Sequence, residues 1–143
     1  MTSIDNNIVK IVEVGPRDGL QNEKTPLTLE QRKALIVDLM QTGLTSIEVG
    51  SCVSAKWVPQ MANSDQLFAD LPQDPKIGFS LLTPNLKGFE SASAVGCQEV
   101  AVFTAASESF TRKNINCSID ESFEKFADVL AAAKSNNIKV RGY

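Results

Sequence analysis

The sequence predicts an α/β fold, and within that class the N-terminal half of a (β/α)8 TIM barrel, with about four strand–helix units followed by a fifth strand. Three observations predict it. Strand-like and helical segments alternate along the chain. Charged residues recur on one face of the strands. The 143 residues also fall short of the about 250 that a complete barrel takes.

The first unit is an expected strand over 8–14 (IVKIVEV) followed by a helix over 29–39 (LEQRKALIVDL). The strand is rich in β-branched residues, and the helix has apolar residues at helical spacing. Thr28 with Gln31 three residues later has the spacing of a capping box at the start of the helix. Gly43 is expected as the C-cap.

The later elements follow in the same alternation. Ser118 with Glu121 repeats the capping-box spacing and opens the last helix, which is expected to run to about residue 135. The remaining segments are expected as strands at 46–49, 76–82, 99–103 and 138–142 and as helices at 63–69 and 85–95. The order is β-α-β-α-β-α-β-α-β, as in a parallel sheet built by right-handed crossovers.

Two architectures use this order, a doubly wound open sheet and a (β/α)8 barrel. The dinucleotide-binding open sheet has G-x-G-x-x-G after its first strand, and this sequence lacks it. The period-two alternation of strands places charged side chains on one face at Glu13, Glu48, Lys139 and Arg141. An open sheet covered by helices on both sides would bury them, whereas a barrel has an interior mouth where polar groups converge. The sequence therefore favours the barrel.

Composition restricts the partners. The net charge is −3, with 43% hydrophobic and 22% charged residues and no run of Lys or Arg, which argues against nucleic acid or an anionic membrane. The start, MTSIDNNIVK, has neither the apolar core of a signal peptide nor an Arg-rich amphipathic segment. Cys52, Cys97 and Cys117 are odd in number and widely spaced, which fits reduced, largely buried thiols in a cytoplasmic protein.

Chemistry is first indicated by Arg17, Asp18 and Gly19, which follow the first expected strand. Arg17 offers a planar, permanently charged fork suited to carboxylate or enolate oxygen. Asp18 is a hard oxygen ligand of the kind that Mg²⁺ or Mn²⁺ prefers. On these three residues alone, a surface Asp-Gly turn with a flanking arginine is the favoured interpretation.

The longer string GPRDGLQNE resembles the signature of the 3-hydroxy-3-methylglutaryl-CoA lyase family of metal-dependent barrel enzymes. Further segments resemble the same family in the same order: SAKWVPQM (54–61), LTPNLKGFE (82–90), AASESFTRKNIN (105–116) and VRGY (140–143). A shorter R-D-G-x-Q core is shared with isopropylmalate and homocitrate synthases. The leading Gly-Pro and the trailing Leu-Gln-Asn-Glu favour the lyase.

The resemblance implies roles for five positions. Arg17 would be the catalytic arginine, binding substrate and stabilising an enolate oxygen, and Asp18 would ligate Mg²⁺ or Mn²⁺. Gln21 and Arg141 would bind substrate. Glu48 would be a catalytic glutamate at the end of the second strand. For Glu48, and likewise for Glu13, two interpretations stay open: the carboxylate holds Arg17 or Arg141 in place, or it takes part in proton transfer or tunes the metal.

The implied reaction cleaves 3-hydroxy-3-methylglutaryl-CoA to acetyl-CoA and acetoacetate, a step of leucine degradation and ketone-body formation. The family completes its metal site with two histidines in an H-x-H arrangement and an asparagine, all in the second half of the barrel, and this chain has no histidine. Residues 1–143 are therefore expected to be the N-terminal part of one barrel domain, inactive alone and homodimeric in full-length form. A processed eukaryotic form would lie in the mitochondrial matrix.

Two other functions remain as alternatives. One is a related metal-dependent enzyme that condenses an α-keto acid by Claisen chemistry. The other is a half-barrel without catalytic activity that serves only assembly. Trp57, in the SAKWVPQM segment, is expected to be a packing anchor for its loop.

Overall fold

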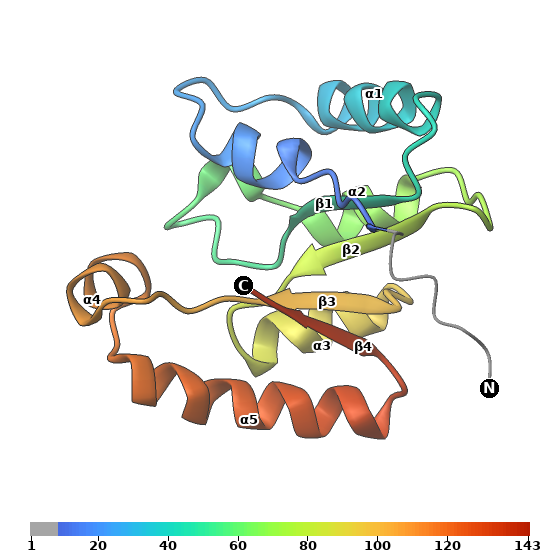
Figure 1. Ribbon diagram of the computed structural model, residues 1–143. Coiled ribbons are helices and arrows are strands. Elements are labelled where there is room, and N and C mark those ends of the chain that lie inside the picture. The colour runs from blue at the N-terminus through green and yellow to red at the C-terminus, as the bar shows by residue number, and fades with distance from the viewer. Residues whose placement is uncertain (1–8) are drawn as a thin grey trace.

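The computed structural model describes residues 9–143, and these carry a four-stranded parallel sheet in the order β1-β2-β3-β4. The strands are β1 (Ser46–Ser51), β2 (Gly78–Leu82), β3 (Glu99–Val102) and β4 (Lys139–Gly142). Each strand lies beside the next one in the sequence, and helical segments connect them (Figure 1). This is the repeating unit of a barrel wall, so the predicted partial (β/α)8 barrel is confirmed.

The helices lie around this sheet. They are α1 (Leu29–Met40), α2 (Ser64–Asp70), α3 (Leu86–Ala94), α4 (Glu108–Ile115) and α5 (Ile119–Ser135), with short turns η1 (Gly15–Gly19) and η2 (Pro59–Met61). In Figure 1, α1 lies above β1, α3 behind the sheet and α5 below β4, while α4 lies beyond the carboxyl ends of the strands. Among residues 9–143 no helix is long and apolar enough to cross a membrane.

Both predicted capping boxes are present. The Thr28 hydroxyl accepts from the Gln31 amide at 3.2 Å, and the Gln31 side chain accepts from the Thr28 amide at 2.9 Å. Ser118 and Glu121 make the same pair of bonds at the start of α5. The prediction for Gly43 is wrong: Gln41 is the C-cap, and Gly43 follows in the next turn with φ 87°. Glycine is favoured there because this φ strains other residues.

The first predicted strand, 8–14, is the main error in the fold. Residues 1–8, which include the first position of this strand and most of the start of the chain discussed above, lie outside the described residues. Over residues 9–14 the structure shows one isolated parallel bridge, from Glu13 to Ile47, in place of a strand. The ladder stops there because Gly15 and Pro16 begin η1, where Val14 caps a turn. Proline at such a position cannot donate to a ladder.

The two faces of the sheet differ in chemistry. The helix-facing side buries apolar residues of the strands against α1, α2, α3 and α5; the largest contributions come from Ile36, Ile47, Val49, Leu67, Leu81, Phe89, Val100 and Val129. In a parallel sheet, paired residues share a face, and Glu48 pairs with Ser80 while Ala101 pairs with Arg141. The opposite face, which corresponds to the barrel interior, is therefore polar, as the sequence predicts.

Candidate active site

Glu13 joins the sheet to η1 and so fixes where η1 begins. Its amide donates to the Ser46 carbonyl at 2.9 Å, and its carbonyl accepts from the Glu48 amide at 2.8 Å. Its carboxylate accepts from the Gly15 amide at 2.6 Å. A Cβ on Gly15 would lie 2.8 Å from that carboxylate oxygen, so this close contact needs a glycine. The interpretation that Glu13 holds an arginine is wrong, because its carboxylate binds backbone.

The η1 turn carries Arg17 inward over the sheet. The Val14 carbonyl accepts from the amides of Arg17 and Asp18 at 3.0 and 2.7 Å, which winds the chain tightly after Pro16. Arg17 is 9% exposed. Its Nε donates to Glu48 Oε1 at 2.5 Å, and its Nη1 donates to Asp18 Oδ1 at 2.9 Å. The side chain is thus clamped between a buried and an exposed carboxylate.

Arg141 reaches the same glutamate from the other end of the sheet. Its Nη2 donates to Glu48 Oε2 at 2.5 Å and lies 3.4 Å from the Ser80 hydroxyl. To make this contact the side chain spans from β4 across β3 and β2 to β1. The interior positions that it passes are small, Ala101 and Ser80. Small side chains at these two positions leave the room that a long guanidinium side chain needs.

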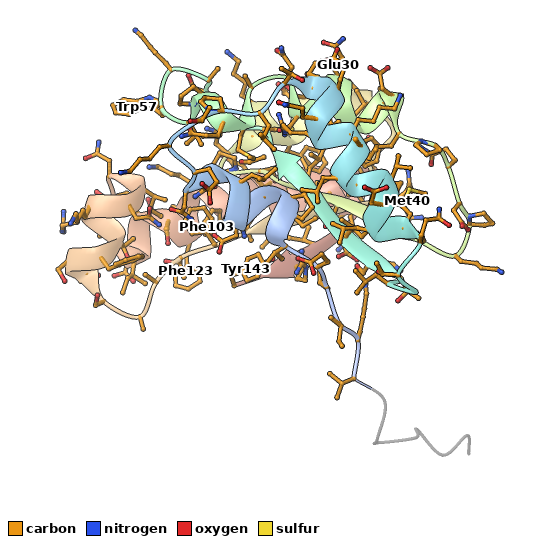
Figure 2. All side chains as sticks on the ribbon, turned by 90° about the horizontal axis from the view of Figure 1, so that it is seen from above. Glu30, Met40, Trp57, Phe103, Phe123 and Tyr143 are labelled. Carbon is orange, nitrogen blue, oxygen red and sulfur yellow. The ribbon has the colours of Figure 1, made fainter. Side chains whose placement is uncertain are left out.

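Tyr143 completes the cluster. Its hydroxyl donates to Glu48 Oε2 at 3.0 Å and accepts from Arg141 Nη1 at 2.8 Å. The guanidinium carbons of Arg141 and Arg17 lie 4.8 and 5.6 Å from its ring centre, within the range of a cation–π contact. The Tyr143 amide donates to the Val102 carbonyl at 3.0 Å, which holds it beside β3. Figure 2 labels Tyr143 close to Phe103, the residue after β3.

The electrostatics follow from burial and from Glu48. Burial alone would lower the pKa of Arg17, but the Glu48 carboxylate, together with Tyr143 and Asp18, raises that pKa above its ordinary value. Burial, reinforced by the Glu48 charge, raises the pKa of Tyr143 above 10.0, and the arginines oppose this only in part. At neutral pH the Arg17 guanidinium is charged and the Tyr143 phenol is neutral.

Glu48 itself is 0% exposed, and three donors occupy its two oxygens: Arg17, Arg141 and Tyr143. Three donors fill most of the acceptor capacity of this buried carboxylate, and giving up a buried charged bond is costly. Of the two interpretations of Glu48, the geometry fits the one in which it orients the two arginines.

Two predicted site residues lie outside this cluster. Asp18 contacts Arg17, but its side chain is 57% exposed. Gln21 is half-buried just after η1, and no hydrogen bond joins its side chain to Arg17, Glu48 or Arg141 in the described part of the chain. For a divalent metal the fit is partial. Glu48 is engaged by the arginines, and residues 9–143 hold no group of three or more His, Cys, Asp or Glu able to bind a metal ion. Asp18 is the one candidate ligand.

Tyr143, Ser80 and Glu99 belong to the cluster or border it and were not predicted. The sequence contains one signal for each of two of them: Tyr143 closes the VRGY segment, and Glu99 lies on the same strand face as Arg141 once the register is known.

The cysteines are free and buried or half-buried, as predicted. Burial raises the pKa of Cys52 to about 12 and that of Cys97 to about 11. Trp57 is 83% exposed, so it is not a packing anchor.

A polar cluster of this kind on the interior face of a (β/α) wall defines a barrel enzyme site. The comparison with known families is then specific: residues 8–143 match the HMGL-like family, and the chain belongs to it.

Individual relatives and a solved structure support the membership of this family. The chain is 58% identical over 135 residues to hydroxymethylglutaryl-CoA lyase of Pseudomonas mevalonii and 56% identical over 135 residues to the mitochondrial enzyme of Homo sapiens. These matches cover 94% of the chain, and 45% and 42% of the relatives. The crystal structure of hydroxymethylglutaryl-CoA lyase from Pseudomonas aeruginosa superposes with a TM-score of 0.90 at 56% identity, covering 94% of this chain and 45% of that one. The chain therefore spans less than half the length of these relatives.

Proposed function

We propose that this chain carries the arginine-bearing part of the active site of a 3-hydroxy-3-methylglutaryl-CoA lyase, which cleaves that acyl-CoA to acetyl-CoA and acetoacetate. The observation that carries the proposal is the Arg17–Glu48–Arg141–Tyr143 cluster on the interior face of the wall. It is supported by relatives at 56–58% identity that bear the lyase name. Those names favour cleavage over the condensing chemistry of the alternative.

The reaction breaks the bond between C2 and C3 of the substrate. The C3 hydroxyl loses its proton, its oxygen forms the ketone of acetoacetate, and the bonding electron pair moves to C2 and onto the thioester oxygen. The resulting enolate of acetyl-CoA takes a proton at C2 to give acetyl-CoA. Negative charge therefore grows on the thioester oxygen, and a donor fixed beside that oxygen lowers the barrier.

Arg17 is the residue that we assign to this oxygen. The Nε of Arg17 donates to Glu48 and its Nη1 donates to Asp18. Within the described residues no hydrogen bond engages its Nη2. A guanidinium held at two nitrogens presents the third in a fixed direction. Such a donor needs little reorganisation as charge develops, which is the source of its catalytic value.

We further propose that Asp18 is one ligand of a divalent metal, Mg²⁺ or Mn²⁺. Its exposed carboxylate is suited to a hard cation. A bound ion of this kind would lower the pKa of the substrate hydroxyl. The other ligands would come from outside this chain's described residues. Gln21 and Arg141 are assigned to the substrate pocket, Gln21 by its place just after η1 and Arg141 by its charge, while Glu48 positions both arginines.

For the whole protein we propose an acyl-CoA as the substrate partner, a homodimer as the assembly, and the cytoplasm as the location. The mitochondrial matrix is the alternative location for a processed eukaryotic form, because the human relative is named as mitochondrial. The roles in leucine degradation and ketone-body formation follow from the products.

The test is a chimera in which this chain replaces the matching 135 residues of the Pseudomonas mevalonii lyase. Acetoacetate release from 3-hydroxy-3-methylglutaryl-CoA is measured with Mg²⁺ or Mn²⁺ for the chimera, for the parent lyase and for the 143-residue chain alone. We expect activity from the chimera and none from the chain alone.

The controls separate misfolding from lost chemistry. Circular dichroism and gel filtration establish that the chimera folds as the parent does. The variant Asp18→Asn should raise the metal concentration needed for half-maximal activity, whereas Asp74→Asn, an acidic control in the loop before β2, should not. A folded chimera that leaves this substrate intact but condenses acetyl-CoA with an α-keto acid would replace the lyase proposal with the condensing enzyme.

A further inference from the structure

Two arginines share one buried carboxylate in the candidate site, and this leaves the charges unbalanced. Arg17 and Arg141 both bind Glu48, which is 0% exposed. Asp18 adds a negative charge, but only beside Arg17 and largely in solvent. Buried charges are stable when each has a partner. Arg141 therefore needs a second carboxylate, and the geometry supplies one.

That carboxylate is Glu99, at the start of β3. Glu99 Oε1 lies 3.5 Å from Arg141 Nε, close enough for charge attraction without the geometry of a hydrogen bond. Both atoms are buried, and neither has a hydrogen-bond partner elsewhere in the described residues. The two side chains share the interior face, because Arg141 pairs with Ala101, two residues beyond Glu99.

With this contact every nitrogen of Arg141 faces a protein group. Nη2 binds Glu48, Nη1 binds Tyr143, and Nε faces Glu99. For Arg17, by contrast, only Nε and Nη1 are hydrogen-bonded within residues 9–143. The second oxygen of Glu99 lies 3.5 Å from Nζ of Lys10, whose side chain is 56% exposed. Glu99 thus connects the cluster to the solvent-facing end of the wall.

We propose that Glu99 is a positioning residue for the candidate site: it fixes the Arg141 guanidinium so that its other nitrogens stay on Glu48 and Tyr143. Through Glu48, the same contact holds Arg17 in the direction that the reaction needs. The kinetic part of the test rests on the proposed function, whereas the spectroscopic part does not.

The spectroscopic part uses the 143-residue chain, whose single tyrosine is Tyr143. Its ionisation is followed by near-ultraviolet absorbance in the parent chain and in Glu99→Gln, which keeps the shape and removes the charge. The groups that face this phenol are Glu48, Arg141 and Arg17. If Glu99 holds Arg141, its loss frees that guanidinium from Tyr143 and the pKa of Tyr143 rises, because a nearby cation favours the phenolate.

The direction in which the pKa of Tyr143 changes in Glu99→Gln decides whether Glu99 holds Arg141. If Arg141 stays in place without Glu99, only a negative charge has been removed, and the pKa of Tyr143 falls or stays the same. Either result overturns the proposal. The matched control is Lys10→Gln, which removes the exposed partner of the same carboxylate and should leave the pKa of Tyr143 unchanged. In an Arg141→Gln background, Glu99→Gln should no longer raise it.

The kinetic part uses the chimera. Glu99→Gln should lower kcat by about tenfold to a hundredfold with KM changed less than about twofold, as expected when a reacting group is misplaced but binding contacts remain. Lys10→Gln should leave both parameters unchanged. A variant that melts earlier but keeps its kcat would show that Glu99 is merely structural. A chimera with no activity at all would count against the proposed function and leave the spectroscopic test to decide the role of Glu99.

Discussion

Two arginines are buried in this chain, and their surroundings are opposite. Arg17 is 9% exposed and Arg32 is 2% exposed. Arg17 lies between the carboxylates of Glu48 and Asp18. Arg32 has only neutral acceptors, the Ala62 carbonyl at 2.8 Å and the Ser64 hydroxyl at 2.9 Å. Its Nε has no hydrogen-bond partner among residues 9–143.

The difference appears in the pKa values. Burial lowers the pKa of Arg32 below its ordinary value, and no carboxylate among residues 9–143 opposes it. At Arg17 burial acts in the same direction and is the largest single cause, but the charge and hydrogen bond of Glu48 together with Tyr143 and Asp18 outweigh it, so the pKa is raised. Burial of an arginine is therefore not by itself a sign of a functional site. Convergence of carboxylates on a buried guanidinium is the more informative feature.

Arg32 has a structural task instead. Besides Arg32, the Ser64 hydroxyl contacts the Ser51 amide at 3.1 Å and the Met61 carbonyl at 2.7 Å. Arg32 thereby ties the segment before α2 to α1 and to the end of β1. The contact is tight at Gly50, where a Cβ would lie 3.0 Å from Arg32 Nη2. The backbone of β1 can approach this closely because Gly50 has no side chain.

The largest expected effect is on stability, from Glu48→Gln. An amide in place of the carboxylate leaves the buried guanidinium of Arg17 and the half-buried one of Arg141 with one neutral acceptor, and breaking a buried ion pair from one side typically costs about 3–5 kcal/mol. Urea unfolding of the chain measures the free energy of unfolding. Glu124→Gln, an exposed carboxylate on α5, is the control and should change it by less than about 0.5 kcal/mol. A loss as small as the control's at Glu48 would mean that the arginines are not held by its charge.

Next in size is Arg17→Lys in the chimera. Lysine keeps the charge but has a single amine in place of the guanidinium fork. It therefore cannot bind Glu48 and at the same time present a second nitrogen to the substrate. We expect kcat to fall by about 10²–10³, the usual cost of losing one preorganised donor. Arg32→Lys is the matched change at the other arginine and should leave kcat as it is. Equal losses at both positions would erase the distinction between a functional and a structural arginine.

A smaller effect is expected from Arg32→Met, which keeps the length and removes the charge. The Ala62 carbonyl and the Ser64 hydroxyl would each lose a donor, and an unsatisfied buried acceptor costs about 1–3 kcal/mol. The relief of an unpaired buried charge opposes this loss. We therefore expect the free energy of unfolding to fall by about 1–3 kcal/mol or less, measured by urea unfolding. A stability loss as large as that of Glu48→Gln would show that Arg32 has a charged partner.

The fold could be predicted where it depends on local patterns. Capping-box spacing placed the starts of α1 and α5, and the charges at Glu48 and Arg141 correctly separated the two faces of the sheet. The strand at 8–14 was wrong because a ladder needs a partner in register, and Gly15–Pro16 ends the pairing after one residue. Helix α4 was not predicted because ESFTRKNI has few apolar residues at helical spacing.

The site could be predicted only in part, for the same physical reason. Arg17, Asp18, Glu48 and Arg141 were found from a loop motif and from strand parity, and all but Asp18 converge in the buried cluster. Which side chains touch depends on register across four strands and on the small residues between them. No local pattern contains that information, so the contacts of Tyr143 and Glu99 emerge only in three dimensions.

The smallest expected effect is a loss of folding stability at alkaline pH. It is expected from the surroundings of Arg17 and not from those of Arg32. Tyr143 has a raised pKa in the folded state, mainly from burial and then from Glu48. Above its ordinary value of 10.0 the unfolded chain loses the phenol proton while the folded chain keeps it. Its contribution to stability is thus complete below pH 10 and is lost as pH rises. Among the described residues, no tyrosine phenol with a raised pKa lies beside Arg32.

Thermal unfolding of the chain and of Tyr143→Phe across this range tests the point. Phenylalanine keeps the ring over the guanidiniums and removes the titrating group, so the variant should lose less stability per pH unit above pH 10. Cys52 and Cys97 also have raised pKa values and act in the same direction, but they are present in both proteins and cancel in the comparison. Equal slopes would mean that the phenol of Tyr143 titrates alike in the folded and unfolded chain, and that Glu48 does not reach it.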